Sequence, residues 1–120
     1  MVLFGALIEL LELNLHLALS DTLVAIELEM KKQQLWSPVP PSEEALSSTA
    51  PFACDTMPLE LWLQFILLPR LQYLLDKGLA LPETSAVAPM AELVWQEMDQ
   101  YNPLVSLLRQ LDKQLSGREQ

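Results

Sequence analysis

Leucine is the residue that most constrains this chain: it occupies 28 of the 120 positions, whereas valine and isoleucine together occupy nine and glycine three. Leucine has a high helix propensity, and the β-branched residues that favour strands are scarce. We therefore expect neither a β-sandwich or barrel nor a fold built on glycine-rich nucleotide loops. The length suits one domain rather than two. The sequence predicts a single all-α domain, an irregular four-helix bundle.

The first helix is predicted to reach about residue 34, and its second half has an amphipathic pattern. The apolar residues there are spaced four, three and four positions apart, which places them on one helical face: Leu19, Leu23, Ile26 and Met30. We expect this face to lie in the core.

The first 18 residues follow a different pattern. From Leu11 to Leu19 every second residue is leucine, which is the period of a strand, yet the sequence offers no strand partner. In a helix, the same residues place apolar groups on nearly every side of the axis. We interpret residues 1–18 as an apolar extension of a helical domain at residues 19–117. The extension either docks on another chain or is poorly ordered, and we favour a continuation of the first helix.

Residues 35–57 are predicted to form a long loop between the first two helices, because three prolines fall within four positions, at 38, 40 and 41. Loops of this length in compact domains are usually pinned or functional. The large side chains of Trp36, Leu46 and Phe52 are expected to pin this one.

The second helix is predicted to be central, since residues 59–75 are apolar on nearly every side. Asp55 or Thr56 is the expected N-cap, with Pro58 in the first turn. Pro69 is expected to kink the helix near Phe65, whose carbonyl loses its donor.

Two further helices are predicted after the loop that starts at residue 81. The third is expected to start near Ala88 and Pro89, and the fourth at Asn102 and Pro103. The apolar stripe expected for the third consists of Met90, Leu93, Val94 and Met98, and that of the fourth consists of Leu104, Leu107, Leu108, Leu111 and Leu115.

The charge balance disfavours several kinds of partner. The formal net charge is −9, and the seven basic residues are scattered along the chain. Nucleic acids and anionic membrane surfaces bind clustered Lys and Arg, so we expect direct binding to neither. We also expect no signal peptide and no membrane insertion, because no basic residue precedes Lys31 and Glu9 and Glu12 interrupt the apolar start. The single cysteine, Cys54, excludes an intrachain disulfide and suggests a cytoplasmic protein.

No residue pattern points to catalysis. His16 is the only histidine, and the spacing of Glu9, Glu12 and His16 is a weak metal-ligand pattern. Cys54 is more simply a packing residue than a nucleophile. We expect no enzyme activity, no metal and no cofactor.

Arg70 is the most informative single residue, because it lies in the most apolar helix and buried arginines are usually paired. We expect it to tie the 35–57 loop to the helix through a carboxylate such as Asp55, and any ligand site to lie along that contact. The full set of candidate binding or loop-anchoring residues is Arg70, Asp55, Gln64, Trp36, Phe52 and Trp62.

Several short motifs occur in an order that resembles the YqcC-like family of small bacterial proteins. They include Leu35-Trp36-Ser37, Pro51-Phe52, Trp62-Leu63-Gln64, Pro69-Arg70, Leu81-Pro82 and Ala88-Pro89-Met90. The resemblance covers about residues 20–116 and implies a compact four-helix fold. It implies no residue roles, because the family has no established biochemical function. Genes of this family neighbour a tRNA pseudouridine synthase in some bacteria, but this chain lacks the size and sheet-rich domain of such an enzyme.

Three functions remain open at the level of sequence. The first is a non-catalytic helical interaction module that binds a protein partner or itself. The second is a small-molecule or anion binder with a pocket near Arg70 and the 35–57 loop. The third, suggested only by gene neighbourhood, is an accessory to tRNA modification.

Overall fold

The computed structural model describes the backbone of residues 2–117 and the side chains of residues 5–117. Its described part is built from helices without strands, which confirms the all-α expectation. The main elements are α1 (Val2–Lys32), α2 (Glu43–Leu46), α3 (Leu59–Trp62), a π-helical turn at Leu63–Leu67, α4 (Leu68–Lys77), α5 (Val87–Val94) and α6 (Asn102–Ser116). Short 3-10 turns lie at Pro51–Ala53 and Asp99–Tyr101. The long loop therefore contains one short helix and one turn.

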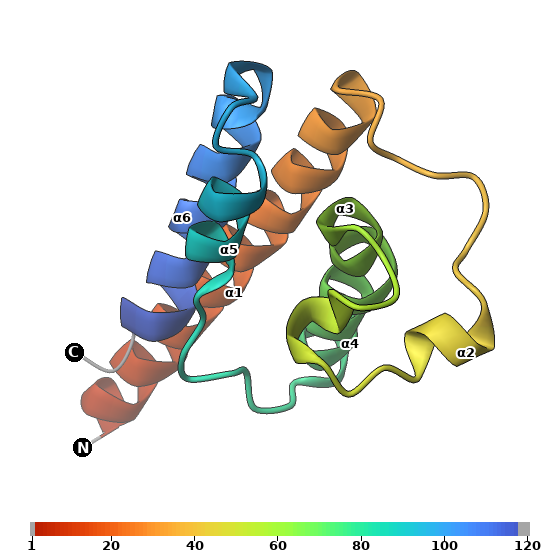
Figure 1. Ribbon diagram of the computed structural model, residues 1–120. Coiled ribbons are helices and arrows are strands. Elements are labelled where there is room, and N and C mark those ends of the chain that lie inside the picture. Colours follow the sequence, from red (N-terminus) through yellow and green to blue (C-terminus); the bar gives the residue numbers. More distant parts are fainter. Residues whose placement is uncertain (1, 118–120) are drawn as a thin grey trace.

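The core forms where four long segments meet. Helices α1 and α6 lie side by side, α5 packs on α6, and α4 packs on α1 (Figure 1). The predicted core face of α1 is confirmed, since Leu19, Leu23, Ile26 and Met30 are all at most 5% exposed. They pack with the stripe of α6, in which Leu104, Leu108, Leu111 and Leu115 are buried.

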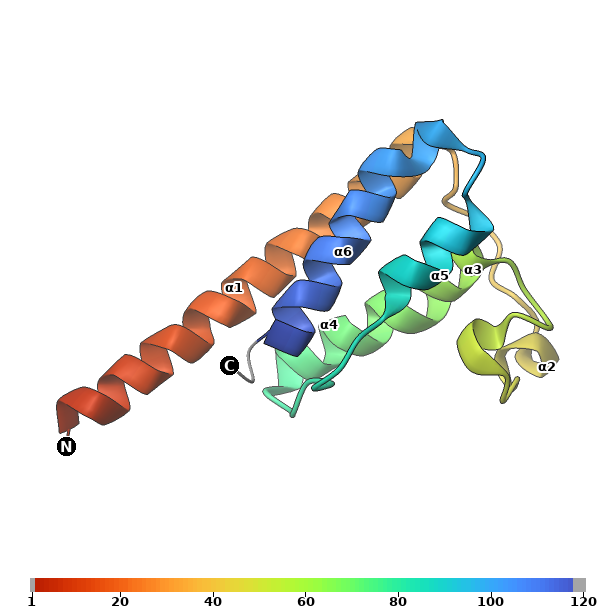
Figure 2. The ribbon, with the colours of Figure 1, turned by 60° about the vertical axis from the view of Figure 1, so that its left-hand side comes forward.

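The first 18 residues continue α1 as one uninterrupted helix, as far as the structure describes them. Figure 2 shows this end of α1 projecting past the ends of α6 and α4. Every described side chain from Gly5 to Asn14 is exposed. We call residues 5–17 the arm. Its alternating leucines form no strand, because a lone segment has no partner for its backbone, whereas a helix satisfies its own N–H and C=O groups.

The segment from Leu59 to Lys77 is a single rod with a local defect where Pro69 enters it. The proline has no N–H, and its ring would clash with the carbonyl of Phe65 in a regular helix. The chain widens into the π-helical turn at Leu63–Leu67 directly before the proline, which is a recognised way of absorbing such a clash. The predicted position of the irregularity, near Phe65, is confirmed, and it takes the form of a π-helical turn.

The predicted N-cap of this rod is wrong. The helix begins at Leu59 after Pro58, without a capping side chain. Asp55 and Thr56 act inside the loop instead: Asp55 Oδ1 accepts a 2.5 Å hydrogen bond from the Ser48 hydroxyl, and the Thr56 hydroxyl donates to the Ala45 carbonyl at 2.9 Å. The two side chains fold the loop back on itself before the helix starts.

The predicted stripe of the third helix is right for Met90, which packs against the core, and wrong for its other three residues. Leu93 is 64% exposed and Met98 44% exposed, and α5 ends at Val94 before Met98 is reached. The face that contacts α6 is instead formed by the buried residues Val87, Ala88, Ala91 and Trp95. The apolar residues occupy both sides of this short helix, so the sequence pattern did not show which side meets α6.

The start of α5 is held by a residue of another helix. The carboxylate of Asp112 in α6 accepts hydrogen bonds from the backbone N–H of Val87 at 3.0 Å and of Ala88 at 2.8 Å. A carboxylate at this position satisfies the free N–H groups of the first turn and complements the helix dipole. Asp112 thereby joins α5 and α6.

Candidate functional site

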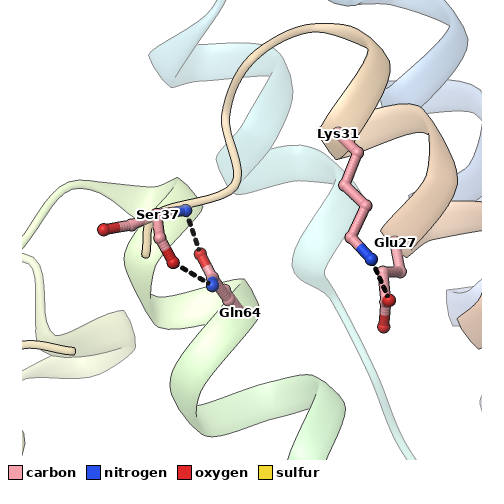
Figure 3. Close-up of polar contacts among 4 residues, drawn as sticks. All are labelled: Glu27, Lys31, Ser37 and Gln64. Atoms are coloured by element: carbon pink, nitrogen blue, oxygen red, sulfur yellow. Dashed lines mark hydrogen bonds and ion pairs between the residues drawn. The ribbon is translucent and has the colours of Figure 1, made fainter. Parts of the chain in front are cut away.

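The beginning of the 35–57 loop is attached to the central rod by one side chain, Gln64. Its Oε1 accepts a hydrogen bond from the backbone N–H of Ser37, and its Nε2 donates one to the Ser37 carbonyl, both at 2.8 Å (Figure 3). Gln64 is only 7% exposed and lies in the π-helical turn. We call this pair the loop clamp. It fixes the path of the chain as it leaves α1.

Trp36 lies next to the loop clamp and faces the end of α1. The Lys31 ammonium lies 5.2 Å from the centroid of a Trp36 ring, within the range of a cation–π contact. The same ammonium forms an exposed ion pair of 2.7 Å with Glu27, drawn in Figure 3. A cleft of about 260 Å³ lies here, lined by Leu23, Val24, Glu27, Trp36, Gln64, Leu68, Pro69 and Gln72.

The far end of the loop is held by aromatic packing. The rings of Phe52 and Trp62 meet edge to face, with centroids 4.8 Å apart. Trp36, Phe52 and Trp62 are all partly buried against the core. Leu46, in contrast, is 38% exposed and does not pin the loop. The aromatic residues chosen from the sequence therefore lie at the two attachment points of the loop.

The predicted role of Arg70 is wrong. Its side chain is exposed, and the ion pairs among residues 5–117 are those of Lys31 with Glu27 and Arg109 with Glu92. The residues of α4 that face the core are Leu68, Leu71 and Leu75, so Arg70 lies on the outer side of a helix that is covered on one side only. Asp55 bonds to Ser48 rather than to Arg70. Arg70 does not line the cleft beside Trp36, so it supplies no charge to a ligand there.

A larger hollow lies elsewhere, between the arm and the C-terminal end of α4. Its volume is about 670 Å³. We call it the arm groove; it is lined by Ile8, Leu11, Glu12, Leu15, His16, Leu74, Leu75, Gly78, Leu79, Ala80 and Leu81. The excess of leucine near the N-terminus indicated an exposed apolar surface. The contribution of α4 was missed, because residues 74–81 are distant in the sequence.

The side chains of the arm are unusually exposed for their type. Leu11 is 59% exposed and Ile8 41% on the groove side, and Leu13 and Leu17 are 52% and 53% exposed elsewhere on the helix. Leucines are usually buried in folded domains, and contiguous exposed apolar patches mark interaction sites. Six of the exposed large apolar side chains lie on the arm: Leu7, Ile8, Leu10, Leu11, Leu13 and Leu17.

The His and Cys side chains, which are able to act in chemistry or ligate a metal, are few in the part of the chain that the structure describes. Within residues 5–117 no group of three or more His, Cys, Asp and Glu side chains is placed to hold a metal ion. His16 and Glu12 border the arm groove, and Cys54 is an exposed free thiol. In the described part of the chain, no helix combines the length and apolar character needed to cross a bilayer.

These features define a small helical domain with an exposed apolar arm, and comparison with known proteins places that domain in a family. The chain belongs to the family described as "DUF446: tRNA pseudouridine synthase C", whose model matches residues 18–114. The match begins directly after the arm, so the whole arm lies outside it.

Relatives that match over most of their length carry no assigned activity. An uncharacterized protein of Haemophilus influenzae is 36% identical over 94 residues, covering 78% of this chain and 89% of that protein. The uncharacterized protein YqcC of Escherichia coli is 44% identical over 72 residues, covering 59% of this chain and 65% of that protein. The solution structure of E. coli YqcC has a TM-score of 0.76, with 33% identity and coverage of 85% of this chain and 88% of that one. The YqcC-like resemblance is thereby confirmed.

One relative carries the name of an enzyme. A "tRNA pseudouridine synthase C" of Pectobacterium carotovorum is 49% identical over 64 residues, which are 53% of this chain but only 17% of that protein. More than four-fifths of the named protein therefore lies outside the match. The name alone assigns no enzyme activity to the helical domain.

Proposed function

We propose that this chain is a non-catalytic interaction module whose arm groove binds an apolar helix of a protein partner. The observation that carries the proposal is the arm groove itself, a hollow of about 670 Å³ bounded by exposed leucines of α1 and by the end of α4. Amphipathic helices commonly bind in grooves of this kind, through side chains at i, i+3, i+4 and i+7.

The energetics of the arm support this role. Each half-exposed leucine that leaves water on binding contributes about 1 kcal/mol. Glu12 and His16 at the border of the groove supply polar groups that orient a partner, while the apolar floor supplies affinity. We place this role in the cytoplasm, because the only cysteine of the chain is a free thiol.

The proposal is tested by quantitative affinity capture from a lysate of the source bacterium with three tagged chains: wild type, Leu11→Glu and Leu93→Glu. Leu11 is 59% exposed in the groove, whereas Leu93 is 64% exposed on α5 outside it, so both variants should fold. A groove partner is retained by wild type and Leu93→Glu and lost by Leu11→Glu. Equal retention of all captured proteins by the three chains would contradict the proposal.

A second candidate, an accessory role in tRNA modification, is favoured by one specific observation. In the Pectobacterium relative, the matched region makes up 17% of a longer protein that carries the name tRNA pseudouridine synthase C. A domain joined to a larger protein in one chain is expected to act together with it, and here the partner would be a separate synthase. The net charge of −9 disfavours binding to the tRNA. In such a role this chain would therefore bind the synthase and not the RNA.

This second candidate predicts binding to a purified tRNA pseudouridine synthase C and no binding to tRNA alone. Calorimetric titration tests the first expectation, and a gel-shift titration at physiological salt tests the second. A salt-sensitive complex of this chain with free tRNA, or no heat of binding with the synthase, would reject the accessory role in this form.

A further inference from the structure

A second apolar feature of α1 lies outside the arm groove. The residues Ala6, Leu10, Leu13, Leu17, Ser20 and Val24 are spaced alternately four and three positions apart. In α1 they fall within about 80° of arc, centred about 130° from the core face. We call them the outer stripe. Leu10, Leu13, Leu17 and Val24 are 53%, 52%, 53% and 57% exposed, so nothing in the fold covers them.

The spacing of the outer stripe is that of a two-helix coiled coil. Apolar residues that alternate at three and four positions keep one seam facing a partner helix as two helices wind around each other. Val24 lies well inside the folded domain, beside the buried Leu23. The stripe therefore extends from the arm onto the part of α1 that the core holds rigid.

We infer that two copies of this chain pair through the outer stripes of their α1 helices, in a parallel two-fold arrangement. The inference rests on the proposed role as an interaction module, but it uses a different side of α1 from the arm groove. A two-fold pair places the same surface on both copies, and a helix with a coiled-coil seam is self-complementary in this sense. Because the stripe faces away from the core, the two domains lie on opposite sides of the paired helices.

The charges next to the stripe agree with a parallel pair. In that arrangement a residue flanking the seam lies beside the residue five positions further along the other helix. His16 then meets Asp21 of the second copy, and Glu9 meets Asn14. From Ala6 to Val24 no like charges face each other across the seam. Glu27 occupies the next seam position, where its charge is balanced by the ion pair with Lys31 of its own helix.

The same charges argue against a membrane as the occupant. Between Gly5 and Met30 the helix contains no Lys or Arg, but it contains five acidic residues: Glu9, Glu12, Asp21, Glu27 and Glu29. Helices that lie on anionic membranes carry Lys and Arg on the polar face. The outer stripe is therefore better suited to pair with the same stripe of a second copy than to lie on an anionic membrane.

The available area is sufficient for a dimer of moderate affinity. The helix from Ala6 to the 60% exposed Leu28 is about 33 Å long and about 12 Å across, so half of its flank is on the order of 600 Å². Two copies together would bury about 1,200 Å², the lower end of the range for specific interfaces. A concentration-dependent dimer is therefore expected rather than an obligate one.

The test is sedimentation equilibrium of the full chain with two matched variants, Leu13→Glu on the outer stripe and Leu11→Glu in the arm groove. The two leucines are 52% and 59% exposed on the same helix. At about 100 μM, well above the Kd expected for such an interface, wild type and Leu11→Glu should approach twice 13.6 kDa. Leu13→Glu should remain monomeric, with an unchanged circular dichroism spectrum and at least a tenfold weaker dimer.

A wild-type chain that stays monomeric at this concentration overturns the inference. So does a dimer that Leu11→Glu abolishes and Leu13→Glu leaves intact. The outcome is separable from that of the proposed function, because Leu13→Glu should still bind the groove partner, whereas Leu11→Glu should lose it and still dimerise.

Cross-linking provides a second measurement that does not depend on a glutamate at the seam. In a Cys54→Ser background, Leu17→Cys places one thiol on the stripe, and in a parallel pair the two copies of residue 17 face each other within disulfide distance. Mild oxidation should give covalent dimers of Leu17→Cys and little of Leu11→Cys. Equal cross-linking of both variants, or none of Leu17→Cys, overturns the parallel pair.

Discussion

Gln64 holds Ser37 by two hydrogen bonds of equal length, since its amide oxygen accepts from the Ser37 N–H and its amide nitrogen donates to the Ser37 carbonyl, each at 2.8 Å. The two residues are 27 positions apart in the chain. The side-chain amide thus supplies partners to the backbone N–H and C=O of Ser37, which lies beyond the end of α1. One buried side chain fixes where the long loop starts.

Replacing Gln64 by leucine should lower the free energy of unfolding by about 2 kcal/mol. The change keeps the side-chain volume but leaves the N–H and C=O of Ser37 without partners, and each unpaired buried polar group costs about 1–3 kcal/mol. Urea unfolding measures the effect. Gln72→Leu is the matched control, because Gln72 is exposed and bonds only to Asp76 one turn away. Equal midpoints for the two variants would show that the loop clamp contributes nothing to stability.

Arg70→Met should change the free energy of unfolding by less than about 0.5 kcal/mol, the usual range for exposed positions without partners. The structure reverses the expectation from sequence, because Arg70 is exposed and no carboxylate of the described residues pairs with it. The same urea series decides the matter. A loss comparable to that of Gln64→Leu would restore Arg70 as the anchor of the loop.

Asp112→Ala should destabilise the chain by about 1–2 kcal/mol, the cost of losing a helix N-cap. Both carboxylate oxygens are used, one by Val87 N–H and one by Ala88 N–H, so Asp112→Asn should recover only part of the loss. Thermal unfolding of the two variants beside Asp76→Ala, an exposed aspartate of α4, measures the difference. Wild-type stability in Asp112→Ala would mean that water caps α5 equally well.

The two long helices that precede loops end in the same way but with different residues. Gln34 follows α1 at φ 61°, and Gly78 follows α4 at φ 64°. At each position the next residue reaches back five positions, with Leu35 N–H bonding to the Met30 carbonyl and Leu79 N–H to the Leu74 carbonyl. This is the Schellman motif, in which glycine is preferred at the left-handed position.

Gln34→Gly should therefore stabilise the chain by about 1 kcal/mol, and Gly78→Ala should destabilise it by a similar amount, because a side chain at positive φ costs about 1–2 kcal/mol. Gln34 is exposed and makes no side-chain hydrogen bond among the described residues. Calorimetry should give a higher melting temperature for Gln34→Gly and a lower one for Gly78→Ala than for wild type. A lower melting temperature for Gln34→Gly would show that the entropy of the unfolded chain dominates.

The features that could be predicted from sequence are those that depend on near neighbours in the chain. The spacing of Leu19, Leu23, Ile26 and Met30 defines one face of a helix wherever that helix lies, and all four are buried. Pro69 disturbs the helix four residues before it in any environment, and the π-helical turn lies there. Periodicity, helix propensity and the absence of a proline N–H act within a few residues.

The features that only the tertiary structure decided depend on which side of a helix meets another element. Arg70 and Leu93 were misplaced because helices with apolar residues on several sides do not reveal which side is covered. The bonds of Gln64 to Ser37 and of Asp112 to Val87 join segments 27 and 25 residues apart. Such contacts form only when the core brings α1 toward the central rod and α6 toward α5. The sequence alone determined where the helices form and which faces of α1 and α6 enter the core, because the second half of α1 and the whole of α6 have an amphipathic pattern. Packing determined which side of α4 and α5 is buried and which polar side chains hold the helices together.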